Sequence, residues 1–155
     1  MARQLRFDLI LLTILTACVL LLAPAAAGLV TVGTGCDYPT LMDALNSASV
    51  VDGDTIHVNS GTYAFTELTK SLTITGEGAD VVTIDLGGMQ GVLRSNGGII
   101  EKIRFTNGDL QISGTVPMAQ NMIIRNCVFE GMLYNAVSGA SISLVGQNNT
   151  FTERV

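Results

Sequence analysis

The sequence has few of the side chains that carry most catalysis and most nucleic-acid binding. It has one histidine, and its 8 lysines and arginines stand against 13 acidic residues, which gives a formal net charge of −5. Because phosphate binding needs a stripe of basic side chains, this composition argues against nucleic acid as a partner. An acidic surface also disfavours anionic polysaccharides as substrates, unless metal ions bridge the two.

A long apolar run is found at the N-terminus. Arg3 and Arg6 precede an apolar run over residues 9–23, which small alanines follow. This order is typical of a secretory signal. We therefore expect residues 1–27 to be a signal peptide cut before Gly28, and the protein to be secreted or held at the cell surface. After cleavage, 8 − 2 basic and 13 − 1 acidic residues would leave a formal charge of −6.

Two alternatives for this segment stay open. Residues 15–18 (LTAC) resemble a lipidation signal, but Cys18 lies inside the apolar run rather than at its end. The segment could also remain as an uncleaved anchor, although its apolar run is short for a membrane helix of about 20 residues. In each case we expect contact with the membrane through this segment alone.

Residues 52–88 contain short alternations of apolar and polar side chains with no helical period between them. The apolar pairs are Ile56/Val58, Leu72/Ile74 and Val82/Ile84, and Gly, Asn or Asp interrupts the chain between pairs. Alternation at period two indicates half-buried strands, and glycine supplies the backbone conformations of tight corners. Short strands, sharp corners and little connecting chain favour a backbone that winds around an axis, which is a parallel β-helix.

A repeat of about one coil supports this fold. Residues 125–129 (RNCVF) align with residues 147–151 (QNNTF), 22 positions later, and residues 101–105 (EKIRF) end on phenylalanine 24 positions earlier. Such a period is the clearest sign of a solenoid. It predicts an interior column of Phe105, Phe129 and Phe151 and a corner ladder of Asn126 and Asn148. The alternation also places Ile103 inside and Thr73, Thr83 and Arg104 outward.

The stretch before the first coil predicts a short amphipathic helix. Residues 40–43 (TLMD) fit a helix N-terminus, and four apolar residues recur on one face, namely Leu41, Ala44, Leu45 and Ala48. A helix here would cover the open end of the core. We therefore expect one domain over residues 28–155, with a cap at 28–50 and coils at 51–155.

Several of these motifs together resemble one known family. They are residues 37–40 (DYPT), 53–56 (GDTI), 61–63 (GTY), 70–74 (KSLTI) and 76–78 (GEG). The pattern is similar to the opening of the pectin-lyase-like right-handed β-helix superfamily, and closest to its branch of surface proteins and periplasmic copper-site-protein-like repeats. The resemblance covers residues 30–88 and implies an all-β, right-handed parallel β-helix of about five coils. It says less about function, because this fold hosts lyases, hydrolases, adhesins and scaffolds.

The sequence lacks the motifs that the enzymes of this superfamily would bring. It has no Asp-Asp pair, no Gly-His-Gly and no Asn-Thr-Asp. His57 should point outward as a polar surface residue, and Asp52 and Asp54 have no further acidic ligands at metal-binding spacing. Glu101 and Glu130 could lie near one another on successive coils, and the arginines beyond the signal segment that could act with them include Arg94, Arg104 and Arg125. We predict no catalytic residue, no metal site and no cofactor.

Two cysteines lie beyond the signal segment. Cys36 and Cys127 are separated by about four coils, or roughly 19 Å, whereas a disulfide needs Cα atoms within about 7 Å. An internal disulfide is therefore disfavoured. Cys127 shares the parity of Phe129 and should be buried, which leaves Cys36 either for an intermolecular disulfide or as an inert, partly buried thiol. Asn148 begins an Asn-Asn-Thr sequon and is a candidate for glycosylation.

These observations favour a structural role. We expect an exported component of the cell surface or envelope, self-associating through its β-helix ends into a sheath or layer. The last residues, 152–155, follow a repeat without a helix to close the coil, so strand edges would be open there. The alternative is a carbohydrate-active enzyme or a carbohydrate-binding β-helix module that contacts surface polysaccharide.

Overall fold

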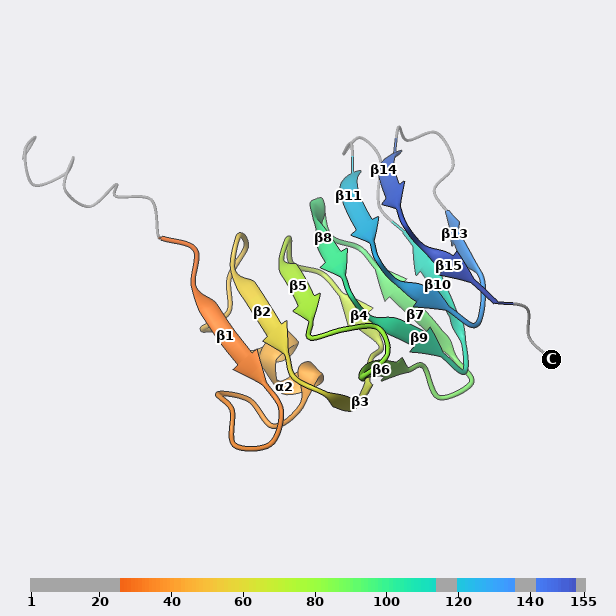
Figure 1. The fold of residues 1–155 in the computed structure, drawn as a ribbon. Coiled ribbons are helices and arrows are strands. Elements are labelled where there is room, and N and C mark those ends of the chain that lie inside the picture. Colours follow the sequence, from red (N-terminus) through yellow and green to blue (C-terminus); the bar gives the residue numbers. More distant parts are fainter. Residues whose placement is uncertain (1–25, 114–119, 136–141, 153–155) are drawn as a thin grey trace, which may run out of the picture.

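The chain forms a β-solenoid of about five turns in a computed structural model that describes residues 26–113, 120–135 and 142–152 (Figure 1). Every strand pair is parallel, and the strands form three sheets that run along the solenoid. The prediction of an all-β parallel solenoid is therefore confirmed. Its right-handed sense stays a prediction, and the expected signal segment, with Cys18, lies outside the described residues apart from Ala26 and Ala27.

Each turn contributes one strand to each sheet, with exceptions at the ends. The six-stranded sheet contains β1 (Leu29–Val32), β2 (Thr55–Val58), β5 (Thr73–Gly76), β8 (Gly97–Glu101), β11 (Gln120–Arg125) and β14 (Ile142–Gln147). The five-stranded sheet contains β3 (Gly61–Ala64), β6 (Val82–Asp85), β9 (Arg104–Thr106), β12 (Val128–Phe129) and β15 (Thr150–Phe151). The four-stranded sheet contains β4 (Glu67–Leu68), β7 (Gln90–Leu93), β10 (Asp109–Ile112) and β13 (Leu133–Asn135).

The core follows the predicted alternation. All nine residues expected inside are buried, namely Ile56, Val58, Leu72, Ile74, Val82, Ile84, Ile103, Phe105 and Phe129. The residues expected outward are partly exposed, namely His57, Thr73, Thr83 and Arg104. The alternation of apolar and polar residues determines the strand register, because a slip by one position would turn every apolar side chain to solvent.

Phenylalanines stack along the five-stranded sheet as the repeat predicted. The rings of Phe105 and Phe129 lie 5.1 Å apart and within 3° of parallel, and those of Phe129 and Phe151 are 5.1 Å apart at 15°. Phe129 is buried as predicted, but the prediction that Phe151 is interior was wrong, because its ring is 58% exposed at the end of the column. The column therefore ends on a ring with one face open among the described residues.

The corner between the six- and five-stranded sheets is built from left-handed residues. Lys102, Asn126 and Asn148 occupy successive turns with φ of 59°, 55° and 51°, and asparagine tolerates this conformation better than most residues. The Asn148 amide donates to Asn126 Oδ1 at 3.4 Å, which confirms the predicted ladder. Asn149 also bridges the turns at this corner, a role that the sequence does not predict: it accepts from the Cys127 N–H and donates to the Ile124 carbonyl.

One short helix, α2 (Leu41–Asn46), lies between β1 and β2 in the chain. Thr40 is its N-cap and accepts from the Asp43 N–H at 3.1 Å, and Leu41, Ala44 and Leu45 are buried. The helix contacts β1 and β3. Placing Ala48 on the same apolar face was wrong: the helix ends at Asn46 and Ala48 is exposed.

Arginine–glutamate pairs join neighbouring turns on all three faces. Their shortest distances are 2.6 Å for Arg125–Glu101, 2.9 Å for Arg104–Glu130 and 2.8 Å for Arg94–Glu67. Such partly exposed pairs contribute about 0–1 kcal/mol each. They add to a stack whose main stabilisation is its apolar interior.

Candidate functional site

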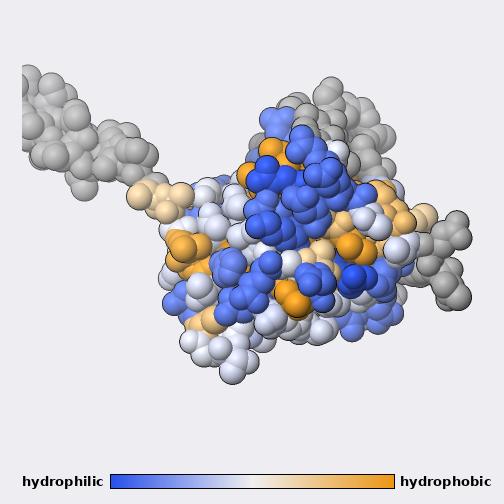
Figure 2. All heavy atoms as spheres, viewed as in Figure 1, coloured by the Kyte–Doolittle hydropathy of each residue, from blue (hydrophilic) through white to orange (hydrophobic). Residues whose placement is uncertain are grey.

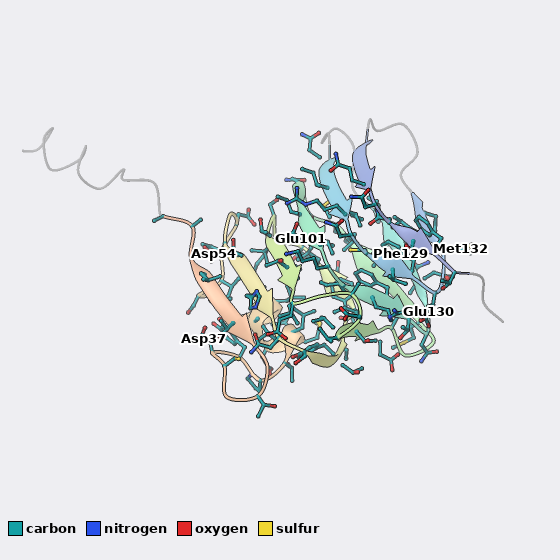
Figure 3. The ribbon with its side chains drawn as sticks, in the orientation of Figure 1. Asp37, Asp54, Glu101, Phe129, Glu130 and Met132 are labelled. Atoms are coloured by element: carbon teal, nitrogen blue, oxygen red, sulfur yellow. The ribbon has the colours of Figure 1, made fainter. Side chains whose placement is uncertain are left out.

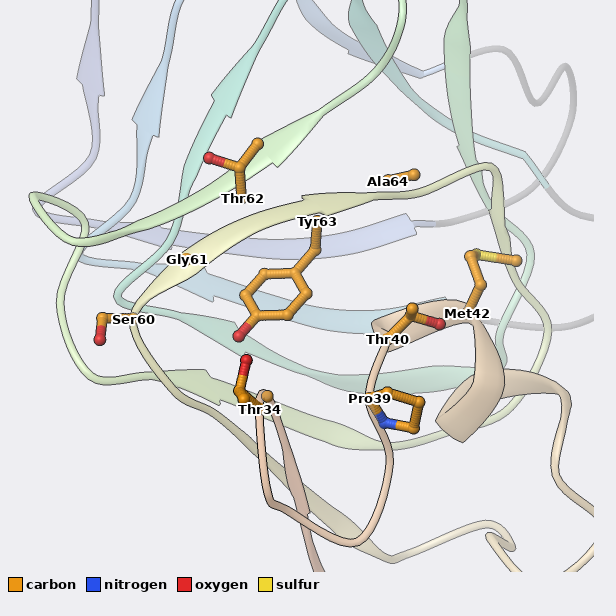
Figure 4. Close-up of a pocket in the computed structure, with 10 residues that line it drawn as sticks. Thr34, Pro39, Thr40, Met42, Ser60, Gly61, Thr62, Tyr63 and Ala64 are labelled. Carbon is orange, nitrogen blue, oxygen red and sulfur yellow. The ribbon is translucent and has the colours of Figure 1, made fainter.

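The candidate site is a groove beside the first strand of the five-stranded sheet. In the first turn the chain leaves β1 for a loop and α2, so β3 is the outermost strand of its sheet at this end. A hollow of about 390 Å³ separates residues 33–42 from β3 (Figure 4). We call it the β3 groove; its lining residues are Gly33, Thr34, Pro39, Thr40, Met42, Ser60, Gly61, Thr62, Tyr63 and Ala64.

The edge of β3 is open toward this hollow. The Gly61 N–H donates to the Val81 carbonyl at 2.9 Å, and Gly61 pairs with Val82 in the parallel ladder to β6. Because alternate residues of a parallel strand bond to the same neighbour, Gly61 and Tyr63 bond to β6 while the backbone groups of Thr62 and Ala64 face away. Those groups have no hydrogen-bond partner within the described part of the chain.

Tyr63 forms the floor of the groove. Its hydroxyl end points toward Thr34 in Figure 4, and its side chain is largely buried. The hydroxyl donates to the Asn59 carbonyl at 2.9 Å. Burial raises the pKa of Tyr63, and the nearby Cys36 and Glu77 act in the same direction. Tyr63 is therefore a neutral, fixed surface and not a base.

The rim carries hydroxyls, and two carboxylates outside the lining are hydrogen-bonded to rim residues. Ser60 and Thr40 lie on opposite sides of Tyr63 (Figure 4). The Ser60 N–H donates to Glu77 Oε2 at 2.8 Å, and the Thr40 hydroxyl donates to Asp43 Oδ2 at 2.6 Å. None of the lining residues is lysine, arginine or histidine. The groove therefore offers hydrogen bonds and negative charge, without a nucleophile paired to a base among its lining residues.

Cys36 lies next to the groove and is half-buried, with the Asn59 amide donating to its sulfur at 3.2 Å. Cys127 is buried, as predicted, and burial raises the pKa of its thiol to about 11. Both thiols are free in the described structure. The intermolecular disulfide through Cys36 stays a prediction.

The two aspartates considered for metal binding shape a turn. Asp54 accepts from the N–H groups of Gly28 at 2.6 Å and Val51 at 2.8 Å, and Asp52 accepts from the Ser71 N–H at 2.9 Å. The Val51 and Gly28 N–H groups lower the pKa of Asp54. Over residues 26–113, 120–135 and 142–152, no group of three or more potential metal ligands is found.

The two glutamates considered together lie at different elements. Glu101 lies in β8, whereas Glu130 follows β12 (Figure 3), and each is paired with its own arginine. Although burial raises the pKa of Glu101, hydrogen bonds from Arg125 and Thr75 outweigh it and lower the pKa. Each carboxylate is therefore engaged by an arginine of a neighbouring turn, and their meeting on successive coils stays a prediction.

The other candidate residues lie apart from the β3 groove. His57 is on the outer face of β2, in register with Thr31 and Thr75. Asn148 is exposed at its corner, and its glycosylation stays a prediction. The groove was not predicted from the sequence, because it forms where a loop and a helix take the place of a strand in the first turn.

Comparisons with known proteins gave no match to a family model, to a curated protein or to a solved structure. The resemblance to the pectin-lyase-like superfamily therefore stays a prediction. Among the described helices, none is long and apolar enough to cross a membrane.

Proposed function

We propose that this protein is an exported structural component of the cell surface or envelope that self-associates through one end of its solenoid. In this proposal the solenoid is right-handed, α2 caps the end next to β1, and the protein is not an enzyme. The observation that carries the proposal is the apolar end next to β13 and β15, where Phe151 is 58% and Met132 is 63% exposed.

This end offers both apolar surface and open strands. Within the described residues, β13, β14 and β15 each pair on one side only. The Phe129–Phe151 stack and the Asn126–Asn148 ladder supply positions onto which a further coil would fit. Burying apolar surface yields about 25 cal/mol per Å², and open strand edges pair readily with other chains. A second copy can supply both contacts.

At the opposite end, the edge of β1 is covered. Thr31 in β1 donates its N–H to Asp37 Oδ2 at 2.8 Å and accepts from the Tyr38 N–H at 3.1 Å. Gly33 N–H donates to the Tyr38 carbonyl at 2.9 Å. Figure 3 shows Asp37 beside β1, far from Met132 at the other end. Head-to-tail stacking must displace this cover, so contact between two β13–β15 ends is favoured, which gives a two-fold dimer.

Sedimentation of the purified protein over a range of concentrations tests the proposal. We expect concentration-dependent dimers that Phe151→Asp abolishes and that Met89→Asp, a charge placed on an exposed methionine elsewhere, leaves intact. Head-to-tail polymers with a reducible Cys36 cross-link would instead show that the protected end opens. A monomer at high concentration, with Cys36 freely alkylated, would refute self-association.

The alternative is a carbohydrate-active enzyme or carbohydrate-binding module, which the hydroxyl-lined β3 groove favours. A lyase would need a free basic residue beside a calcium site, but Arg94, Arg104 and Arg125 are each paired with a glutamate. We expect no turnover of pectate, with or without calcium. Unsaturated products that disappear on mutation of Arg104 or Arg125 would establish the enzyme instead, and a polysaccharide-binding screen tests the module.

A further inference from the structure

We infer that the β3 groove binds an extended peptide segment of a partner protein, which adds to β3 as an extra strand. This site lies at the opposite end from the proposed dimer contact and does not depend on it. The central observation is that Thr62 and Ala64 present strand-edge N–H and C=O groups without partners in the described structure, directly along a groove.

The groove has the shape that strand addition needs. Extended peptides bind open sheet edges through main-chain hydrogen bonds, and alternate side chains enter adjoining surface features. Here the four residues of β3 supply the edge, and residues 33–42 form the facing wall with Pro39 and Met42 as apolar contacts. The neighbouring strand β1 differs, because Asp37 and Tyr38 form hydrogen bonds with the backbone N–H and C=O groups on its open edge. No comparable cover lies over the edge of β3 in the described residues.

The charge of the rim selects the peptide. Asp43 and Glu77 are held beside opposite sides of the groove through Thr40 and Ser60, and the lining residues carry no positive charge. Opposite charges across an interface guide association and set specificity. The preferred partner is therefore an extended segment with lysine or arginine flanking small or β-branched residues.

A proline substitution tests the edge directly. Ala64→Pro removes a groove-facing N–H that the ladder to β6 does not use, and proline is tolerated on edge strands where the N–H faces solvent. Ala64→Ser is the matched control, because it changes the side chain and keeps the N–H. Protection of the Tyr63 amide from hydrogen exchange, measured in both variants, shows that the ladder to β6 is intact.

Short peptides from a random displayed library are selected on the full chain and then measured on the variants. We expect selected peptides to be basic and extended, to lose about tenfold or more in affinity on Ala64→Pro, and to keep their affinity on Ala64→Ser. Glu77→Gln should weaken binding and reduce its salt dependence. In the wild-type complex, hydrogen exchange of the Thr62 and Ala64 amides should slow, while Tyr63 is unchanged.

The contrary outcomes are equally specific. Selection without any enriched peptide, or peptides that bind Ala64→Pro and Ala64→Ser alike, would overturn the inference. Neutral oligosaccharides that compete for the groove without slowing exchange at Thr62 and Ala64 would assign it to the carbohydrate-binding alternative instead. A copy of this chain that protects the same amides would also overturn the choice of partner.

Discussion

At the scale of residues, the phenylalanines of the aromatic column differ in burial between the interior of the solenoid and its end. Phe129 is sandwiched between the rings of Phe105 and Phe151 and is almost fully buried, whereas Phe151 has a neighbour on one side among the described residues. Aromatic pairs contribute beyond the area they bury. Phe129 should therefore contribute more to the free energy of unfolding than Phe151, although both occupy the same position of the repeat.

Truncating the column tests this difference. Phe129→Ala and Phe105→Ala should each lower the free energy of unfolding by about 3–5 kcal/mol, because each leaves a cavity in a packed interior. Phe151→Ala, the control from the same column, should cost less because its ring is already 58% exposed. Urea unfolding measures all three. Equal losses at Phe129 and Phe151 would contradict the described packing.

Asp54 gives a residue-scale prediction for pH. Its pKa is lowered in the folded protein because the N–H groups of Val51 and Gly28 bind the carboxylate. A lowered folded pKa contributes stability above the unfolded value of about 3.9, and that stability is lost as the pH falls through the folded pKa. In thermal unfolding, Asp54→Asn should lower the Tm near neutral pH and flatten its fall below about pH 4. An unchanged acid profile would contradict this assignment.

At the scale of elements, the stacking of successive coils depends on how closely their backbones approach one another at the corners. At the corner between the five- and four-stranded sheets, a Cβ on Gly131 would clash with the Gly108 carbonyl oxygen, and a Cβ on Gly108 would clash with the Met89 carbonyl oxygen. These contacts are with backbone, which cannot move aside as a flexible side chain can. Glycine therefore sets how tightly successive turns stack at this corner.

Gly131→Ala should consequently destabilise the solenoid by about 1–3 kcal/mol, as overpacking does. Gly146→Ala in β14 is the matched control, since the nearest described atom to a Cβ there is the Asn149 amide nitrogen at 3.5 Å. Chemical denaturation of both variants measures the difference. A Gly131 variant as stable as the Gly146 variant would mean that the turns can separate at this corner.

The sequence predicted the strands and the coil repeat because both are local patterns. Period two determined which side chains are buried, and the offset of Phe105, Phe129 and Phe151 determined their register. It did not predict the end of α2 at Asn46 or the cross-turn role of Asn149. The open edge of β3 was also missed, because an edge is defined by which strand is absent beside it.

At the scale of the whole molecule, the two ends of the solenoid differ in whether their outermost strands are covered by other residues. The face in Figure 2 is largely hydrophilic, with hydrophobic residues in separate spots. The β1 end has its edge covered by Asp37 and Tyr38, whereas β14 and β15 have no such cover among the described residues. Covering one edge is a recognised defence against uncontrolled strand pairing. Here it covers β1 and leaves the edge of β3 open, so in the proposed assembly it disfavours contacts at the β1 edge.

Removing this cover should convert limited association into open-ended growth. Asp37→Ala frees the Thr31 N–H and hydroxyl, both of which Asp37 Oδ2 accepts at 2.8 Å, and so exposes part of the β1 edge. A β13–β15 end can then meet a β1 end, and such head-to-tail contacts do not close. Electron microscopy and sedimentation should show polymers for Asp37→Ala and dimers for Asp80→Ala, which removes an equal charge from an exposed turn. If both variants assemble alike, the cover over β1 does not control association.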